Sequence, residues 1–453
     1  MTYAEAVQFL YSLRLFGLKL GLENTFKLAA QAGNPQEQLR FIHVAGTNGK
    51  GSTCAMLESI YRAAGFRVGL FTSPHLVSFR ERIQVNRELI SEPAVVRLVG
   101  DLRGQRNSGL QPGNHGAGFQ PAQPGAAVSP DSLVHAGHEA APTFFEFVTV
   151  MALRYFAEKH CDLVIWETGM GGRLDATNIV TPLASVITNI QLDHQQWLGY
   201  TLAEIAAEKS GIIKPGVPVI TAADSPEALH VIERTAREKN APLVRVDSAS
   251  GQSLSPRIPA LPLLGDHQLL NASLALATVD AVRDSIPVTE EAIRLGLETV
   301  QWPGRLQSVR TSSGGTILLD GAHNPAGAAA LRAVLQKSFP DARPTLVLGM
   351  LEDKDWARVC QLLAPLSRRV LLAPVPNERT APPERLREAC LKSAPSAQVA
   401  ACSSLGDALK LTANDPLIVI TGSLYLVGEA LELLGLAPAA PSERGLNEWT
   451  LKK

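Results

Sequence analysis

The sequence is poor in the features that mark several specialised classes of protein. Its five cysteines are an odd number without C-x-x-C spacing, which argues against a disulfide framework or a zinc site and favours a reducing compartment. A formal net charge of -1 gives no indication of a nucleic-acid or membrane partner. No apolar run is long enough to span a bilayer, and the N-terminus lacks a basic segment followed by an apolar core. We therefore expect a soluble, cytoplasmic protein.

The composition that remains is that of an ordinary globular α/β protein. Hydrophobic residues make up 45% and charged residues 19% of 453 residues, a length that by itself suggests about three domains. From Gly304 onward, short apolar runs at 317–319, 346–348, 370–372 and 417–420 alternate with helical segments. This alternation predicts a second α/β unit with its own core, joined to the first near residues 299–303.

A glycine-rich turn follows the apolar run at residues 41–45. Three glycines lie within residues 46–51, and a helical pattern from Lys50 to Ala64 begins inside the turn. Such a turn binds phosphate through its backbone N–H groups and the helix dipole, with Lys50 reaching the outer phosphates and the Ser52 hydroxyl placed for Mg²⁺. The loop is shorter than G-x-x-x-x-G-K-[ST], and a glycine separates the lysine from the serine. A plain strand–helix turn is the alternative, but this combination favours nucleotide binding.

Later strand ends also open into polar loops. The strand expected at 68–71 leads into residues 72–83, for which a substrate loop and an ordinary surface connection are comparable interpretations. The next strand ends in Glu167 and a glycine-rich loop, and α/β proteins bind ligands at the carboxyl ends of strands. A further strand at 184–188 leads to His194. Its place after a third such strand end makes a metal ligand and a structural histidine about equally favoured.

Residues 103–142 differ in composition from the rest of the chain. They are rich in Gly, Pro, Gln and Ala and show no apolar periodicity, which predicts a disordered insertion. Low-complexity histidines without packed neighbours are usually solvated. We therefore assign no function to His115, His135 and His138.

Glu146 and Lys209 each allow a structural and a functional interpretation. Thr143 and Glu146 match a capping box at a helix start, whereas the alternative is a carboxylate among aromatics that binds a metal. The pattern favours the cap. Lys209 shares an apolar helix face with Ile205 and Ile213, and spacing alone favours a packed stem whose ammonium reaches solvent. Burial would instead favour the neutral amine, which alone can add carbon dioxide.

Together, these stretches resemble the folylpolyglutamate synthase and dihydrofolate synthase family, a branch of the Mur ligase superfamily. The matching stretches are AGTNGKGS (45–52), TSPHLVSFRERI (72–83), FFEF (144–147), ETGMGGRLDATN (167–178), ITNIQLDHQQWLG (187–199), AAEKSGIIKP (206–215), GDHQLLNASLAL (265–276), PGRLQ (303–307), DGAHNP (320–325), GMLEDKD (349–355) and GSLYLVGE (422–429). They cover almost the whole chain. Thr168, Gln195 and the long insertion depart from the family pattern, but no departure removes a residue on which the chemistry depends.

The resemblance implies a fold and a site. The fold is a P-loop, Mur-ligase-type domain for ATP and pteroate over residues 1–300, followed by a smaller Rossmann-like domain over 301–453 that binds glutamate and closes on ATP. The implied ATP contacts are Gly46, Thr47, Asn48, Gly49, Lys50, Gly51, Ser52, Asn271, Arg305 and Asp320. The implied ligands of magnesium, with two ions expected, are Ser52, Glu146 and His194, beside a carbamylated Lys209. The implied pteroate contacts are Ser73, Pro74, His75, Leu76, Leu174, Asp175 and Ala176.

Lys50, Lys209, His194 and His323 form the expected catalytic set. An arginine beside Pro-Gly is usually a surface linker residue, but a nucleotide clamped between two domains explains Arg305 better. The expected reaction is ATP-dependent amide ligation, in which a substrate carboxylate attacks the γ-phosphate to give an acyl phosphate. The α-amine of L-glutamate then displaces phosphate, and positioning and electrostatics supply most of the catalysis. By resemblance, the acid is dihydropteroate or a folate that already carries glutamate.

Two alternatives remain beside a monomeric folate ligase. A cell-wall Mur ligase would share the architecture, but it would carry an additional N-terminal domain for a UDP-sugar, and here the phosphate loop begins too early for one. A nucleotide-operated switch without turnover is the second alternative. The joint presence of Glu146, His194 and Lys209 argues against it.

Overall fold

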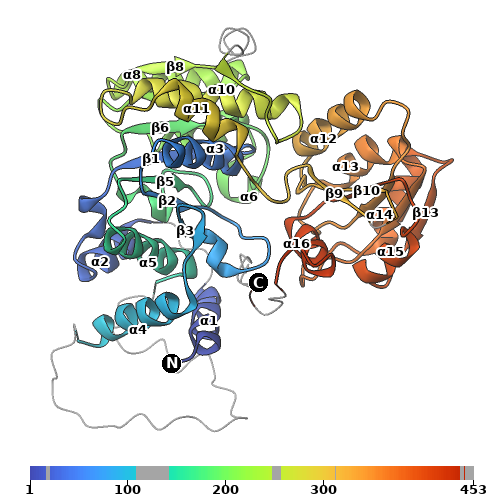
Figure 1. Cartoon of the computed structure of the whole chain (residues 1–453), viewed down its shortest axis with the longest axis horizontal. Coiled ribbons are helices and arrows are strands. Elements are labelled where there is room, and N and C mark those ends of the chain that lie inside the picture. Colours follow the sequence, from blue (N-terminus) through green and yellow to red (C-terminus); the bar gives the residue numbers. More distant parts are fainter. Residues whose placement is uncertain (17–20, 109–141, 247–256, 312, 439–442, 444–453) are drawn as a thin grey trace.

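The computed structural model consists of two α/β domains that lie side by side (Figure 1). It describes residues 1–16, 21–108, 142–246, 257–311, 313–438 and 443. Within these residues, no helix combines the length and the apolar character needed to cross a bilayer. Length alone suggests about three domains, whereas the described residues form two sheets.

The first domain is built on an eight-stranded sheet. Its strands are β1 (Phe41–Ala45), β2 (Val68–Phe71), β3 (Ile83–Val85), β4 (Glu88–Leu89), β5 (Leu163–Glu167), β6 (Ala184–Ile187), β7 (Val219–Thr221) and β8 (Leu243–Arg245). They lie in the order β4-β3-β2-β5-β1-β6-β7-β8, and all pairs are parallel except those made by β3. The central strands β1, β2, β5 and β6 are buried along their whole length, as expected for a parallel sheet covered on both faces.

Helices cover both faces of this sheet (Figure 1). They are α1 (Tyr3–Ser12), α2 (Glu23–Gln31), α3 (Lys50–Ala63), α4 (Glu92–Ser108), α5 (Phe144–Glu158), α6 (Gln195–Leu198), α7 (Leu202–Ser210), α8 (Pro226–Glu238), α10 (Asp266–Ala281) and α11 (Glu290–Glu298). Ile42 and Val44 of β1 pack with α3, α10 and α11, while Phe41 packs on the opposite face with α1, α4 and α5. The helix that begins at Lys50 is therefore held between the sheet and two further helices.

The second domain is built on a six-stranded sheet. Its strands are β9 (Gln307–Arg310), β10 (Thr316–Leu319), β11 (Thr345–Leu348), β12 (Arg369–Leu372), β13 (Gln398–Ala401) and β14 (Leu417–Thr421), in the order β13-β12-β11-β14-β10-β9 with β9 antiparallel. Its helices are α12 (Pro325–Ser338), α13 (Trp356–Leu363), α14 (Pro383–Ser393), α15 (Leu405–Leu411) and α16 (Leu424–Leu433). One apolar cluster of this domain includes Leu76 and Val77 of the first domain, so the two cores are in contact.

Several sequence predictions are confirmed and others are wrong. The helix from Lys50 and the strand at 68–71 form as expected. Residues 103–108 belong to α4 and not to an insertion. The rest of the expected insertion, residues 109–141 with its three histidines, lies outside the described residues. The helix expected from Leu202 to Ile213 ends at Ser210, because Gly211 follows and Pro215 lies close behind.

Candidate active site between the two domains

The glycine loop lies between β1 and α3 and packs tightly on its neighbours. Gly46 has φ +146°, and a Cβ there would lie 1.8 Å from Thr188 Oγ1. Gly49 has φ +86°, and a Cβ there would lie 2.5 Å from Asn271 Oδ1. The Thr188 hydroxyl donates to the Asn48 carbonyl at 2.6 Å, so the end of β6 holds the loop. Both glycines are required by backbone conformation and by close approach.

Two lysines converge on one carbonyl of this loop. Lys50 Nζ donates to Gly46 O at 3.1 Å and to Thr47 O at 3.3 Å, and Lys209 Nζ donates to Gly46 O at 2.8 Å. Lys209 is only 4% exposed, so its amine does not reach solvent as helical spacing alone had favoured. Burial, reinforced by the positive charge of Lys50, lowers the pKa of Lys209 to about 7. A substantial fraction of this amine is therefore neutral at neutral pH.

A buried carboxylate, Glu167, ends β5 beside the loop. Burial raises the pKa of Glu167 to about 7, and Lys50 is the strongest of the cations that oppose this shift. Its Oε2 accepts the backbone N–H of Ser73 at 3.0 Å. The Ser73 hydroxyl is buried and has no hydrogen-bond partner among the described residues. The Glu167 carboxylate thus lies near Lys50 of the glycine loop and is bonded to Ser73, whose hydroxyl is unsatisfied.

Glu146 caps the first turn of α5. Its carboxylate accepts the Thr143 backbone N–H at 2.6 Å, and the Thr143 hydroxyl accepts the Glu146 N–H at 3.3 Å. These two bonds complete the capping box of α5, which is the interpretation that the sequence pattern favours. The pKa of a second carboxylate, Glu167, responds to Lys50. Sequence reasoning noted Glu167 only as a strand end, although that position was the signal for it.

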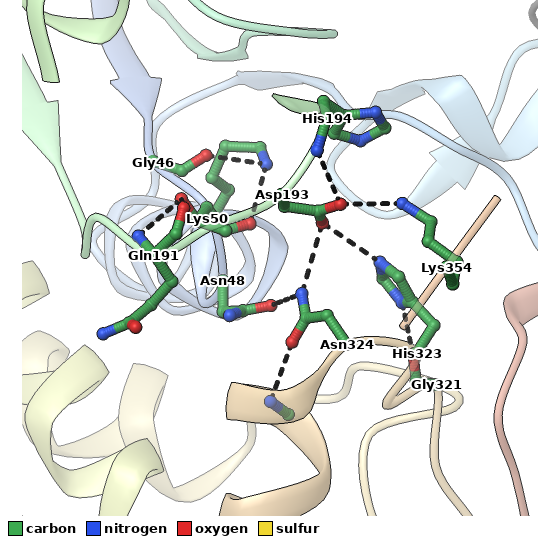
Figure 2. A network of polar contacts seen from close by, with 12 residues as sticks. Gly46, Asn48, Lys50, Gln191, Asp193, His194, Gly321, His323, Asn324 and Lys354 are labelled. Atoms are coloured by element: carbon green, nitrogen blue, oxygen red, sulfur yellow. Dashed lines mark hydrogen bonds and ion pairs between the residues drawn. The ribbon is translucent and has the colours of Figure 1, made fainter. Parts of the chain in front are cut away.

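The second domain reaches this site through a group of polar contacts that we call the interdomain clasp: Asp193, His323, Asn324 and Lys354 (Figure 2). Asp193 Oδ1 accepts from Lys354 Nζ at 2.7 Å, and Asp193 Oδ2 lies 3.7 Å from His323 Nε2. Asn324 Nδ2 lies 3.2 Å from Asp193 Oδ2 and 3.1 Å from Asn48 Oδ1, so it joins the clasp to the glycine loop.

The clasp is screened from solvent. The side chains of Asp193 and Lys354 are 10% and 11% exposed. Burial alone would raise the pKa of Asp193, but its contacts with His323, His194 and Lys354 lower it well below its usual range. Sequence reasoning assigned no role to Asp193 or Lys354. The signals were present, since one directly precedes His194 and the other lies within the matched stretch GMLEDKD.

His194 lies at the edge of the site beside the clasp. Its backbone, at φ +49°, donates its N–H to Asp193 Oδ1 at 2.8 Å (Figure 2), and the residue is exposed. Desolvation by the surrounding atoms is the first cause that lowers the pKa of His194, and the positive charges of Lys354 and Lys209 act in the same direction. The neutral imidazole, which is the form that binds metals, is therefore favoured.

The other expected ATP contacts lie around the same loop. Asn271 touches Gly49 and donates to Gln268 Oε1 at 3.0 Å. Burial lowers the pKa of Arg305, and Asp320 and Glu167 are the anions that oppose this shift. Arg305 therefore faces anionic groups of both domains, which the surface-linker alternative does not explain. Ser52 is buried in the first turn of α3.

The expected pteroate contacts fall in two separate loops. In one loop Leu76 packs against the second domain, where a Cβ on Gly428 of α16 would lie 2.1 Å from Leu76 O. In the other loop the buried Asp175 uses Oδ1 to accept from the Thr177 N–H at 3.1 Å and Oδ2 to accept from the Met170 N–H at 2.8 Å. The carboxylate of Asp175 thus shapes its own loop.

Comparison with known proteins places this geometry in a family. The model of the Mur ligase, glutamate ligase domain matches residues 304–424. The dihydrofolate synthase/folylpolyglutamate synthase of Bacillus subtilis is 34% identical over 451 residues, which cover 94% of this chain and 98% of that protein. The folylpolyglutamate synthase of Lacticaseibacillus casei is 35% identical, over 96% of this chain and 99% of that protein. The chain belongs to the dihydrofolate synthase/folylpolyglutamate synthase family.

Solved structures of this synthase family have the same fold. FolC of Escherichia coli in complex with DHPP and ADP has a TM-score of 0.79 at 30% identity, and 96% of this chain and 98% of that chain are covered. The folylpolyglutamate synthase of Mycobacterium tuberculosis complexed with ADP has a TM-score of 0.80 at 28% identity, over 96% of this chain and the whole of that chain. The expected Mur-ligase-type fold with two α/β domains is confirmed, and so is the assignment to a family of ATP-dependent ligases.

Proposed function

We propose that this synthase joins L-glutamate to dihydropteroate, to a folate that already carries glutamate, or to both, and that it releases ADP and phosphate. The observation that carries the proposal is the convergence of Lys50, Lys209 and the interdomain clasp at one glycine loop. A loop that binds phosphate on one domain and is faced by His323 and Lys354 on the other suits a reaction with three substrates. A switch without turnover has no need of the second set of groups.

The residues of this site support two chemical steps. An oxygen of the substrate carboxylate attacks the γ-phosphorus, the bond to ADP breaks, and Lys50 neutralises charge on the transferring group. The glutamate amine then attacks the acyl carbon, phosphate leaves, and the nitrogen loses a proton. The proton passes to solvent, and His323 is suited to position the reacting groups, because its Nδ1–H donates to Gly321 O at 2.8 Å and its Nε2 lies 3.7 Å from Asp193 Oδ2.

The residues at the glycine loop fit magnesium. The unsatisfied Ser73 hydroxyl and the buried Glu167 carboxylate are oxygen ligands of the kind that Mg²⁺ prefers, and Ser52 adds a hydroxyl at the start of α3. His194 and a carbamylated Lys209 would supply a second position, since the two side chains lie within electrostatic reach of each other. When bound, magnesium would supply positive charge to offset that of the phosphate oxygens. Glu146, which resemblance implies as a ligand, stays a candidate beside Glu167, because capping α5 does not exclude metal binding.

Exchanging Glu167 for glutamine is expected to weaken the magnesium requirement of the site. Glu167→Gln keeps the shape and the acceptor for Ser73 but removes the charge, so the magnesium concentration for half-maximal activity should rise by about tenfold or more. Calorimetric titration of magnesium into the ADP complex provides a readout that is independent of turnover. Glu146→Gln, measured in parallel, tests whether the carboxylate that caps α5 also binds magnesium. A magnesium response that changes in Glu146→Gln but stays at the wild-type level in Glu167→Gln would refute the role proposed for Glu167.

Breaking the interdomain clasp should lower kcat strongly and change the melting temperature little. Lys354→Met leaves Asp193 partly buried without its closest cation, which weakens the contact between the domains, so kcat is expected to fall by about 10- to 100-fold. Lys337→Met is a matched control. The ion pair of Lys337 with Asp266 also joins the two domains, but both of its side chains are exposed to solvent. Steady-state kinetics of both variants, with melting curves, would test this. Equal effects of the two substitutions would contradict a specific role for the clasp.

The decisive assay for the function is phosphate release with a panel of acids and amino acids. Release that requires both dihydropteroate, or a folylglutamate, and L-glutamate supports the proposal. Release with a UDP-sugar acid would indicate a cell-wall ligase, and nucleotide binding without release under any combination would indicate a switch.

We further propose that the enzyme acts as a monomer in a reducing compartment, the cytoplasm. One chain supplies both sides of the site, so no second copy is needed to complete it. All five cysteines are free thiols, four of them buried, which is typical of a reducing environment. Light scattering coupled to gel filtration would test the oligomeric state, and a dimer mass would refute it.

A further inference from the structure

A residue near the C-terminus, Glu443, is held against the loop that carries the first set of expected pteroate contacts. It follows the second domain in sequence but is only 8% exposed on the first domain. Its Oε2 accepts from the Ser78 hydroxyl at 2.8 Å and from the Phe79 backbone N–H at 2.7 Å. Its backbone carbonyl lies 3.0 Å from His75 Nε2. Three contacts thus join Glu443 to residues 75–79.

His75 also contacts Arg82, and the charge of Arg82 acts on the buried carboxylate of Glu167. Arg82 Nε donates to His75 Nδ1 at 2.9 Å, so the ring must carry its proton on Nε2 and donate it to the Glu443 carbonyl. Burial, followed by the charge of Arg82, lowers the pKa of His75 well below its usual range. Arg82 in turn is one of the cations that act on the pKa of Glu167. His75 is therefore a fixed, neutral connector between Glu443 and Arg82.

The loop does not need Glu443 as an ordinary helix cap. Glu81 already accepts the backbone N–H groups of Leu76, Val77 and Ser78 at 2.7, 2.9 and 2.8 Å. Glu81 and Ser78 form the capping box of the short 3-10 helix at Phe79–Arg82. Glu443 adds a constraint from a distant part of the chain, which fixes the loop relative to the rest of the molecule.

Tyr3, at the start of α1, also lies close to the carboxylate of Glu443. Burial is the main cause that raises the pKa of Tyr3, and the charge of Glu443 comes second. The start of α1 therefore lies close to this carboxylate. A buried carboxylate with few competing solvent contacts makes strong, directional hydrogen bonds to its partners.

We propose that Glu443 is a positioning residue for the pteroate substrate: it holds residues 73–76 in the conformation that binds the acid. The inference rests on the proposed function, because that function identifies the ligand of the loop. It assigns no chemical step to Glu443 itself. Loss of its carboxylate should weaken binding of the acid while leaving the nucleotide loop, which Thr188 and Asn271 hold, unchanged.

The test compares Glu443→Ala and Glu443→Gln with Glu388→Ala, a substitution at an exposed glutamate of α14. Glu443→Ala is expected to raise the KM for dihydropteroate by about tenfold and to leave the KM for ATP within about twofold. Glu443→Gln, which keeps an acceptor, should have a smaller effect. Ser78→Ala combined with Glu443→Ala should cost less than the sum of the two single effects, since both remove the same bond. An unchanged KM for dihydropteroate, or equal rises for dihydropteroate and ATP, would overturn the inference.

A second readout does not depend on turnover. Hydrogen exchange at the backbone N–H of Phe79 should accelerate by about tenfold or more in Glu443→Ala and stay at the wild-type rate in Glu388→Ala. If the wild-type enzyme releases no phosphate with dihydropteroate and glutamate, the proposed function fails. The exchange rate at Phe79 still shows in that case whether Glu443 holds the loop in place. If the wild type is active and Phe79 exchanges equally in both variants, the positioning role of Glu443 is refuted.

Discussion

Lys50→Ala is expected to lower kcat by about three orders of magnitude and to leave the melting temperature almost unchanged. The side chain donates to two carbonyls of its own loop, Gly46 O and Thr47 O, and buries no apolar surface that the core requires. Lys209 still donates to Gly46 O in the variant, so the loop keeps one of its two side-chain donors. What the variant loses is the charge that is proposed to act on the transferring phosphate.

Single-turnover measurement of phosphate release, with circular dichroism as the check on folding, would test the Lys50 prediction. Lys392→Ala, at an exposed lysine in the last turn of α14, is the matched control and should retain wild-type kcat. A folded Lys50→Ala enzyme with near-normal turnover would remove the glycine loop from the catalytic site.

Local features of the sequence predicted this loop because the information lies within a few residues. The apolar strand, the glycines and the helical pattern are contiguous from Phe41 to Ala63. The reason for each glycine is not local, since the atoms that exclude a side chain belong to Thr188 and Asn271. The sequence therefore predicts the strand, the glycine loop and the helix, but not the residues that hold the loop in place.

Glu146 and Glu167 show where sequence reasoning was incomplete at the site. Both are buried carboxylates beside apolar residues, but only Glu146 lies in a recognisable capping pattern. That Glu167 lies near Lys50 follows from the placement of β5 between β2 and β1. Strand order is a property of the whole sheet and cannot be read from either motif alone.

The longest-range contacts could not be predicted from pattern at all. Asp193 and Lys354 are 161 residues apart and meet only because the second domain closes on the first. His75 and Glu443 are separated by 368 residues, and no periodicity or motif relates them. Such pairs depend on domain placement, which the sequence expresses only through the complete fold.

Lys209→Ala is expected to reduce kcat as strongly as Lys50→Ala, because the side chain is proposed to carry a carbamate. The neutral amine attacks the carbon of CO₂ and loses a proton, which converts a cation into a carboxylate at the end of a long arm. With its pKa lowered to about 7, the buried Lys209 has the neutral amine that this addition requires. The product would be a magnesium ligand beside His194.

Acetate should partly restore Lys209→Ala, since a small carboxylate can occupy the space left by the missing arm. Lys214→Ala is the matched control, because this lysine lies on the same segment but donates to Asn178 O at 3.1 Å and not to the glycine loop. Its kcat should stay within about threefold of wild type, as is usual for a substitution away from the reacting groups.

The modification can be observed directly with ¹³C-labelled bicarbonate. A carbamate carbon resonance is expected in the wild type and in Lys214→Ala and should be absent from Lys209→Ala. Acidification to about pH 6 in CO₂-free buffer should remove the resonance and the activity together, because protonation of the amine opposes re-addition of CO₂. Bicarbonate at neutral pH should restore both. High-resolution density for a plain ammonium at Lys209, in active enzyme with nucleotide and magnesium bound, would show that the site works without the carbamate.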